Sequence, residues 1–350
     1  MSHNKEKSEK KQGYPAGRSR FLVRELAELW FKDIENVMKP SSCARYRSHA
    51  ARYLFPYIGS MDACSFSRKD LSDLLGFLKT GGSTEESLSQ YTIYILEGMV
   101  RSMFRYGAGK NLVPEILFGK SEYTIINRKE AVPLSELELE QLMHIVSKQC
   151  MDMQVQVLLP LYAGLSLSEV CGLKWEDVNL ETGRIHVHRN LMRIQRKTGD
   201  IDSGTATVMS ECELSVNEYR EFVMPGKLNI LLRTIASKRN ISQERYVAEL
   251  YKKTGRRTLD ANIQEDTDPV PPDGRTLQYR LKTVGKQADI PGLTFQALRD
   301  TFVVMCLQAG GDIYSIAYVL GTGINAIYDR YKYLLVKKDS FLKGIGQGLL

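Results

Sequence analysis

The stretch from Thr294 to Tyr333 constrains the fold of this chain most strongly. Within it, Arg299 is followed by a Gly310-Gly311-Asp312 turn, a Leu320-Gly321 pair and then Tyr331 on a tyrosine-rich terminal helix. Gly-rich turns between apolar, helix-forming runs bring the ends of such a segment together. The order therefore predicts helices joined by glycine-containing turns, with an arginine on an early helix and a tyrosine on the last one.

Composition limits the kinds of protein to consider. The 350 residues suffice for two domains, and a net charge of +7 suits a polyanionic partner. The six cysteines are widely spaced without a C-x-x-C pair, which argues against zinc and a disulfide framework and indicates a reduced, cytoplasmic setting. No apolar run reaches the roughly 20 residues that cross a bilayer. We expect a protein with no cofactor, no metal and no membrane partner.

The chain divides by pattern into four regions. Residues 1–20 are expected to form a flexible basic arm, and residues 21–110 a helical domain of four helices with short connections. In that domain, Ser41 or Ser42 is expected to cap the second helix. Residues 111–133 read as a linker, and residues 134–350 as the second domain.

The second domain begins with a recognisable helix start. Ser135 and Glu138 have the spacing of a capping box. An apolar helix, a Gly164-Leu165 turn and a Trp175-x-Asp177 segment follow within residues 158–178. The alternation over residues 184–187 predicts a half-buried strand. The fold class is therefore mainly α with a small β-hairpin or sheet, an α+β arrangement.

The segments at residues 158–178 and 294–333 resemble the two signature boxes of the tyrosine recombinases, the phage-integrase family. The resemblance implies a helical core-binding domain followed by an integrase-type catalytic domain, with double-stranded DNA as the partner. It also implies that Arg299 binds the scissile phosphate and that Tyr331 attacks it, without metal or ATP. The spacing from Leu320-Gly321 selects Tyr331 over Tyr328 and Tyr333, for which packing is the simpler interpretation.

The catalytic set departs from the family at several positions. Ser166 stands where the first arginine is ordinarily found, and a hydroxyl cannot replace a guanidinium. Gln296 stands where the family usually has a histidine, although its amide can still donate a hydrogen bond. Thr322 stands where the family usually has a histidine or a tryptophan. Lys197 is the best candidate for the family's lysine that protonates the leaving oxygen. Most lysines in such a basic run, however, are solvated charges or phosphate contacts. Asp300 is expected to compete with phosphate for Arg299.

Two functions follow from this pattern. The first is a DNA-binding protein of the family that acts in site-specific recombination and integration, for example of a mobile element, with impaired chemistry. The alternative is an active integrase that uses Tyr331 with a non-standard donor set, or a DNA-binding regulator on the same scaffold. Whether the chain is an enzyme is left open. It is expected to work as a homo-oligomer on DNA or beside a partner recombinase.

Overall fold

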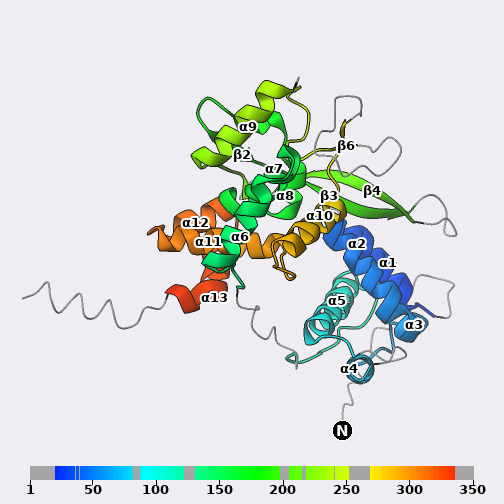
Figure 1. The fold of residues 1–350 in the computed structure, drawn as a ribbon. Helices are drawn as coiled ribbons and strands as arrows, with labels where there is room; N and C mark the ends of the chain where they lie inside the picture. Colours follow the sequence, from blue (N-terminus) through cyan, green and yellow to red (C-terminus); the bar gives the residue numbers. More distant parts are fainter. Residues whose placement is uncertain are drawn as a thin grey trace, which may run out of the picture. The chain divides into compact units, whose positions relative to one another are not determined.

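The computed structural model describes residues 20–35, 37–38, 40–81, 87–121, 131–197, 205–214, 218–239, 241–251 and 269–335. The chain divides into two compact units, Met1–Asn127 and Arg128–Leu350. Helices predominate, and the described strands form small antiparallel sheets (Figure 1), so the predicted α+β class is confirmed. None of the described helices is long and apolar enough to cross a membrane.

The described residues of the first unit form helices and their connections, with no strand among them. Its core buries Leu26 and Trp30 of α1 against Leu54, Leu96 and Phe104. Full burial of each such side chain stabilises the fold by about 1.5–3 kcal/mol. The elements are α1 (Val23–Ile34), α2 (Pro40–His49), the π-helical segment η1 (Ala50–Leu54), α3 (Phe55–Ile58), α4 (Arg68–Lys79) and α5 (Gln90–Gly109).

The second helix of this unit begins earlier than predicted. It begins at Pro40, so Ser41 and Ser42 lie in its first turn rather than at its cap. The fixed φ of proline suits the first helical position, which explains this start. The helix then widens into η1, where the Phe55 backbone N–H bonds the Ala50 carbonyl. The following proline lacks an N–H for the regular ladder, which accounts for the wide turn.

The second unit packs helices around small antiparallel sheets. Strands β1, β2 and β5 form one sheet, β3 and β4 form a long hairpin, and β6 pairs with β7. The helices are α6 (Glu136–Ser147), α7 (Met151–Ala163), α8 (Leu167–Gly172), the 3-10 turn η2 (Trp175–Asp177), α9 (Gly226–Lys238), α10 (Gly274–Gln287), α11 (Phe295–Gln308), α12 (Ile313–Leu320) and α13 (Ile324–Leu335). The strands are β1 (Val178–Asn179), β2 (Arg184–Val187), β3 (Arg189–Lys197), β4 (Thr205–Glu213), β5 (Arg220–Val223), β6 (Leu250–Tyr251) and β7 (Pro269–Val270).

Local sequence signals account for much of this unit. Ser135 caps α6, and its backbone N–H bonds the Glu138 carboxylate at 2.8 Å, which confirms the capping box. In β2, Ile185 and Val187 are buried while their neighbours are exposed, which confirms the half-buried strand. Helix α7 is the most buried helix of the core and packs against α8, α9 and α11. It carries the turn that precedes Ser166 to the centre of the unit.

A second apolar cluster joins α11, α12 and α13, which lie together in Figure 1. Phe302 and Val303 of α11 pack with Leu320 of α12 and with Ile327 and Tyr331 of α13. This cluster fixes α13, and so it determines where the Tyr331 hydroxyl lies.

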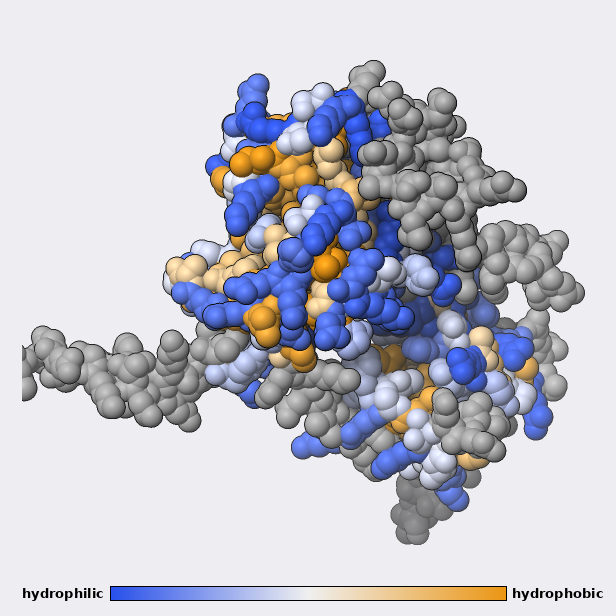
Figure 2. All heavy atoms as spheres, viewed as in Figure 1, coloured by the Kyte–Doolittle hydropathy of each residue, from blue (hydrophilic) through white to orange (hydrophobic). Residues whose placement is uncertain are grey.

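Figure 2 shows that apolar side chains on the visible face of the second unit form small patches separated by polar residues. Large continuous apolar patches mark contact surfaces between proteins. This face therefore has the mixed character of a surface in contact with water.

Candidate nucleic-acid cleavage site

Arg299 lies at the meeting point of α7, α11 and α12. Its Nε atom donates a hydrogen bond to the Gly164 carbonyl at 2.8 Å, and an Nη atom donates to the Leu320 carbonyl at 2.5 Å. Each carbonyl lies two residues before another predicted site residue, Ser166 and Thr322. Burial lowers the pKa of Arg299, against the opposing effect of the nearby Glu169. The guanidinium therefore ties the two box segments together.

Gly164 has a left-handed backbone, with φ of 63°, at the end of α7. A Cβ atom there would lie 2.8 Å from the side chains of Leu320 and Phe302. We expect Gly164→Ala to lower the free energy of unfolding by about 2–4 kcal/mol, because strain and overpacking add. Urea unfolding measures this change. Gly292→Ala is the control, since nothing lies within 4 Å of its Cβ position, and an equal loss in both variants would refute the explanation.

Ser166 is the N-cap of α8. Its hydroxyl accepts from the Glu169 backbone N–H, and its own N–H donates to the Glu169 carboxylate at 2.7 Å. Glu169 is buried, with 7% of its surface exposed. The turn that would carry an arginine thus carries a capping box with a buried carboxylate.

Tyr331 is buried, with 2% of its surface exposed, and its hydroxyl donates to Asp300 Oδ1 at 2.7 Å. Burial, followed by Asp300, raises the pKa of Tyr331 far above that of a free phenol. The flanking Tyr328 and Tyr333 are 50% and 43% exposed. The interpretation of these two tyrosines as packing residues is therefore wrong, and it is Tyr331 that packs into the core.

Asp300 is the centre of this network. Arg330 binds it with two nitrogens, at 3.0 and 2.6 Å, and Gln296 Nε2 donates to it at 2.8 Å. Burial raises the pKa of Asp300, but the hydrogen bonds from Arg330, Tyr331 and Gln296 outweigh it and hold the pKa below the usual range. Asp300 adds negative charge near Arg299, as expected, but its hydrogen-bonded ion pair is with Arg330. Successive helix residues point about 100° apart, so the two side chains diverge.

Thr322 is exposed just beyond α12, after Gly321 ends the helix in a left-handed conformation. It lines a cleft of about 610 Å³ together with Arg220, Gly321 and Tyr318. Lys197 is the last residue of β3, paired in register with Thr205, and its side chain lies outside the part that the structure describes. The structure thus brings Arg299 to the ends of α7 and α12, next to the turns that carry Ser166 and Thr322. It brings Gln296 and Tyr331 to Asp300, whereas Lys197 belongs to the hairpin.

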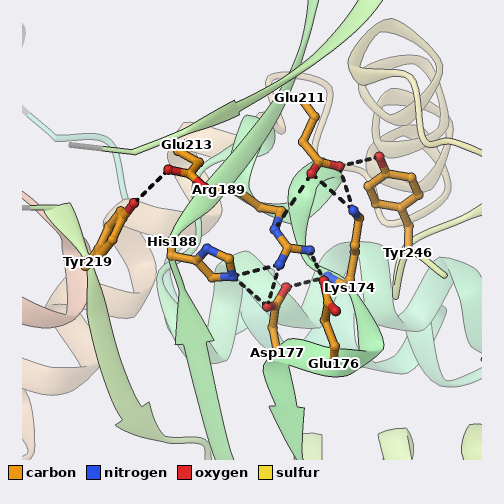
Figure 3. Close-up of polar contacts among 9 residues, drawn as sticks. All are labelled: Lys174, Glu176, Asp177, His188, Arg189, Glu211, Glu213, Tyr219 and Tyr246. Carbon is orange, nitrogen blue, oxygen red and sulfur yellow. Dashed lines mark hydrogen bonds and ion pairs between the residues drawn. The ribbon is translucent and has the colours of Figure 1, made fainter. Parts of the chain in front are cut away.

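A charged network holds the base of the β3–β4 hairpin (Figure 3). The buried Arg189 pairs with Glu176 at 2.7 Å and donates to Asp177 at 3.1 Å, both on η2. Glu211 on β4 binds Lys174 and accepts from the Tyr246 hydroxyl at 2.8 Å. These contacts fix the start of the strand that ends at Lys197.

Sequence reasoning missed one residue of this site. Arg220 of β5 has only 2% of its surface exposed and forms an ion pair with Glu169 at 2.8 Å. Its strand has four residues and lies far along the chain from both boxes. The nearest local signal was an arginine opening a short strand, which is common in proteins without any such site.

Residues 133–333 match the phage integrase family. The match covers more than half of the chain and includes both box segments. The chain belongs to the phage integrase family. This confirms the resemblance that the two box segments indicated.

Other comparisons agree with this assignment. The chain is 23% identical over 214 residues to a protein of Escherichia coli (strain K12) named as the defective protein IntQ, and spans 52% of that protein's length. Among solved structures it resembles the integrase of transposon Tn1549 in complex with a circular-intermediate DNA, with 16% identity, a TM-score of 0.65, and coverage of 92% of this chain and 98% of the other. It also resembles a lambda integrase dimer bound to a COC′ core site, with 10% identity, a TM-score of 0.57, and coverage of 89% and 95%. These likenesses confirm the integrase fold.

Proposed function

We propose that this chain binds double-stranded DNA in site-specific recombination or integration and that its own strand cleavage is slow. The observation that carries the proposal is the state of Tyr331. Tyr331 packs in the cluster that contains Leu320, whose carbonyl accepts a hydrogen bond from Arg299, yet the Tyr331 hydroxyl donates to the buried Asp300. A nucleophile must leave that bond before it can reach a phosphate, and hydrogen bonds to charged groups contribute about 1.5–3 kcal/mol.

Helix α10 supports the DNA-binding part. Arg275, Tyr279, Lys282 and Lys286 are exposed and recur at the spacing that places them on one face of the helix. A basic helix face with an exposed aromatic ring suits contact with a phosphate backbone. The Tn1549 and lambda integrases are recorded in complexes with DNA.

DNA binding should be strongly salt-dependent. Because each phosphate contact releases counterions, log K should fall against log salt with a slope of about −0.9 per contact. Fluorescence anisotropy of a labelled duplex in increasing NaCl measures the slope. We expect Lys282→Gln/Lys286→Gln to make the slope shallower by about 1.8.

Lys227→Gln/Lys238→Gln on α9 removes the same charge from another helix and is the matched control. Equal slopes in the wild type and the α10 variant would contradict the role of α10. Affinity that does not change with salt would contradict backbone binding altogether.

The setting of this function is also proposed. A lambda integrase tetramer is recorded on a Holliday junction. By analogy, we propose that this chain acts on DNA as a homo-oligomer or together with a partner recombinase. We place this activity in the cytoplasm, as part of the recombination of a mobile element. A second candidate is an active integrase that uses Tyr331, which Gln296 favours because its amide is close to the same network.

A further inference from the structure

Two guanidinium groups lie together at the end of α12. Arg220 Nε donates to the Val319 carbonyl at 2.6 Å, and Arg299 donates to the next carbonyl, that of Leu320, at 2.5 Å. The two arginines come from β5 and α11. The positive charge of Arg220 also acts on Arg299, so the two guanidinium groups are near each other. A Cβ atom on the following Gly321 would lie 2.6 Å from an Arg220 nitrogen, which shows how closely this turn covers Arg220.

Both arginines share one buried carboxylate. Glu169 pairs with Arg220 at 2.8 Å, and its charge also acts on Arg299. Burial raises the pKa of Glu169, but Arg220 and then Arg299 outweigh it, so the pKa is lowered and the carboxylate is ionised. Glu169 is also the residue that completes the capping box of Ser166. Arg220 thus meets the same turn from which the family's first arginine is missing.

The charges in this group do not balance. Arg220 and Arg299 contribute two positive charges against the single negative charge of Glu169, because the other nearby carboxylate, Asp300, is already paired with Arg330. An uncompensated buried charge is costly, so such a group favours an anion as its third partner. The Arg220 Nη2 atom is buried without a hydrogen-bond partner among the described residues. Arg220 also lines the cleft of about 610 Å³ beside Thr322, and this cleft has room for a phosphodiester.

We propose that Arg220 supplies the guanidinium that Ser166 lacks, so that Arg220 and Arg299 together form a binding site for a phosphodiester phosphate of DNA. This inference rests on the proposed DNA-binding function. The guanidinium would then come from the start of β5 rather than from the start of α8, and it pairs with Glu169 of the α8 capping box. Phosphate binding would then persist although the sequence of the first box has lost its arginine.

Inorganic phosphate is the probe for this site, titrated calorimetrically into the full chain at an ionic strength held constant with chloride. We expect Arg220→Met to weaken phosphate binding at least tenfold, as the loss of a charge-assisted pair does. Arg184→Met is the control, because Arg184 lies on the same sheet but is about half exposed, with its nearest acid at 3.9 Å. It should bind phosphate as the wild type does.

A swap variant separates binding from folding. In Ser166→Arg/Arg220→Met the guanidinium returns to the start of α8 and faces the same Glu169. We expect this variant to bind phosphate with an affinity within a few-fold of the wild type. The same result is expected if circular dichroism shows that Arg220→Met alone does not fold. Unchanged binding in a folded Arg220→Met, no binding in the wild type, or no recovery in a folded swap variant would each overturn the inference.

The same proteins distinguish this inference from the proposed function. A wild type that binds phosphate through Arg220 but binds no duplex supports the site and refutes the DNA role. The site alone is refuted if the wild type binds duplex DNA with a salt-dependent affinity but Arg220→Met leaves phosphate binding unchanged.

Discussion

Tyr331→Phe is expected to abolish covalent attachment of this protein to DNA. The substitution removes the only atom that can form a phosphotyrosyl bond at this position, and loss of a nucleophile lowers a rate by roughly 10³-fold or more. The measurement uses a nicked suicide duplex built on a sequence that the protein selects from fragmented DNA, with the adduct resolved on a denaturing gel. DNA affinity should change little, because one hydroxyl subtracts little from a phosphate-dominated interface.

Tyr328→Phe and Tyr333→Phe are the matched controls. Both side chains are about half exposed on the same helix, and the Tyr333 hydroxyl donates to the Ala131 carbonyl. They should leave adduct formation unchanged. Strand cleavage that persists in Tyr331→Phe would refute the assignment of the nucleophile, and cleavage that requires Mg²⁺ would indicate a different nuclease chemistry.

Asp300→Asn is expected to lower the free energy of unfolding by about 2–3 kcal/mol at neutral pH. The carboxylate is almost fully buried, and the change removes the charge that Arg330 binds with two nitrogens. Because Arg330 is about a quarter exposed, we expect less than the full cost of breaking a buried pair. Urea unfolding with matched folded baselines measures the difference.

The pH dependence of this effect has a definite sign. The pKa of Asp300 is held below its usual range, so its contribution is present above the ordinary aspartate pKa of about 3.9 and is lost as pH falls through the folded value. The difference between wild type and Asp300→Asn should therefore shrink in acid. Asp312→Asn, at the exposed cap of α12, is the control and should cost only a few tenths of a kcal/mol, since asparagine also caps helices. A gap between wild type and Asp300→Asn that widens in acid would contradict this role of Asp300.

Local signals in the sequence were sufficient for many elements of the fold. The capping box of Ser135 and Glu138 and the alternation in β2 depend on residues a few positions apart, and both are found where expected. The start of α2 was misplaced because Pro40 itself fits the first helical position. The burial of Tyr331 had a signal, since Ile327 and Tyr331 are four residues apart and share one helix face.

The candidate site was less accessible to sequence reasoning because its contacts are long-range. Asp300 follows Arg299 in the chain, yet it meets Arg330 on another helix. Arg220 reaches Glu169 and Val319 only through the placement of a four-residue strand. Side-chain direction within a helix and pairing between distant elements decide these contacts, and neither can be read from a motif's spacing.

The rate of adduct formation in the wild type and in Asp300→Asn tests the central claim most directly. If Asp300 restrains Tyr331, the folded variant should form the 3′-phosphotyrosyl adduct roughly tenfold faster or more, in line with a hydrogen bond of about 1.5–3 kcal/mol to a charged group. The wild type should react slowly, and Tyr331→Phe should remove the adduct in both backgrounds. If Asp300 instead accepts the proton of Tyr331 during attack, the wild type will react quickly and Asp300→Asn will be slower, a result that would contradict the account.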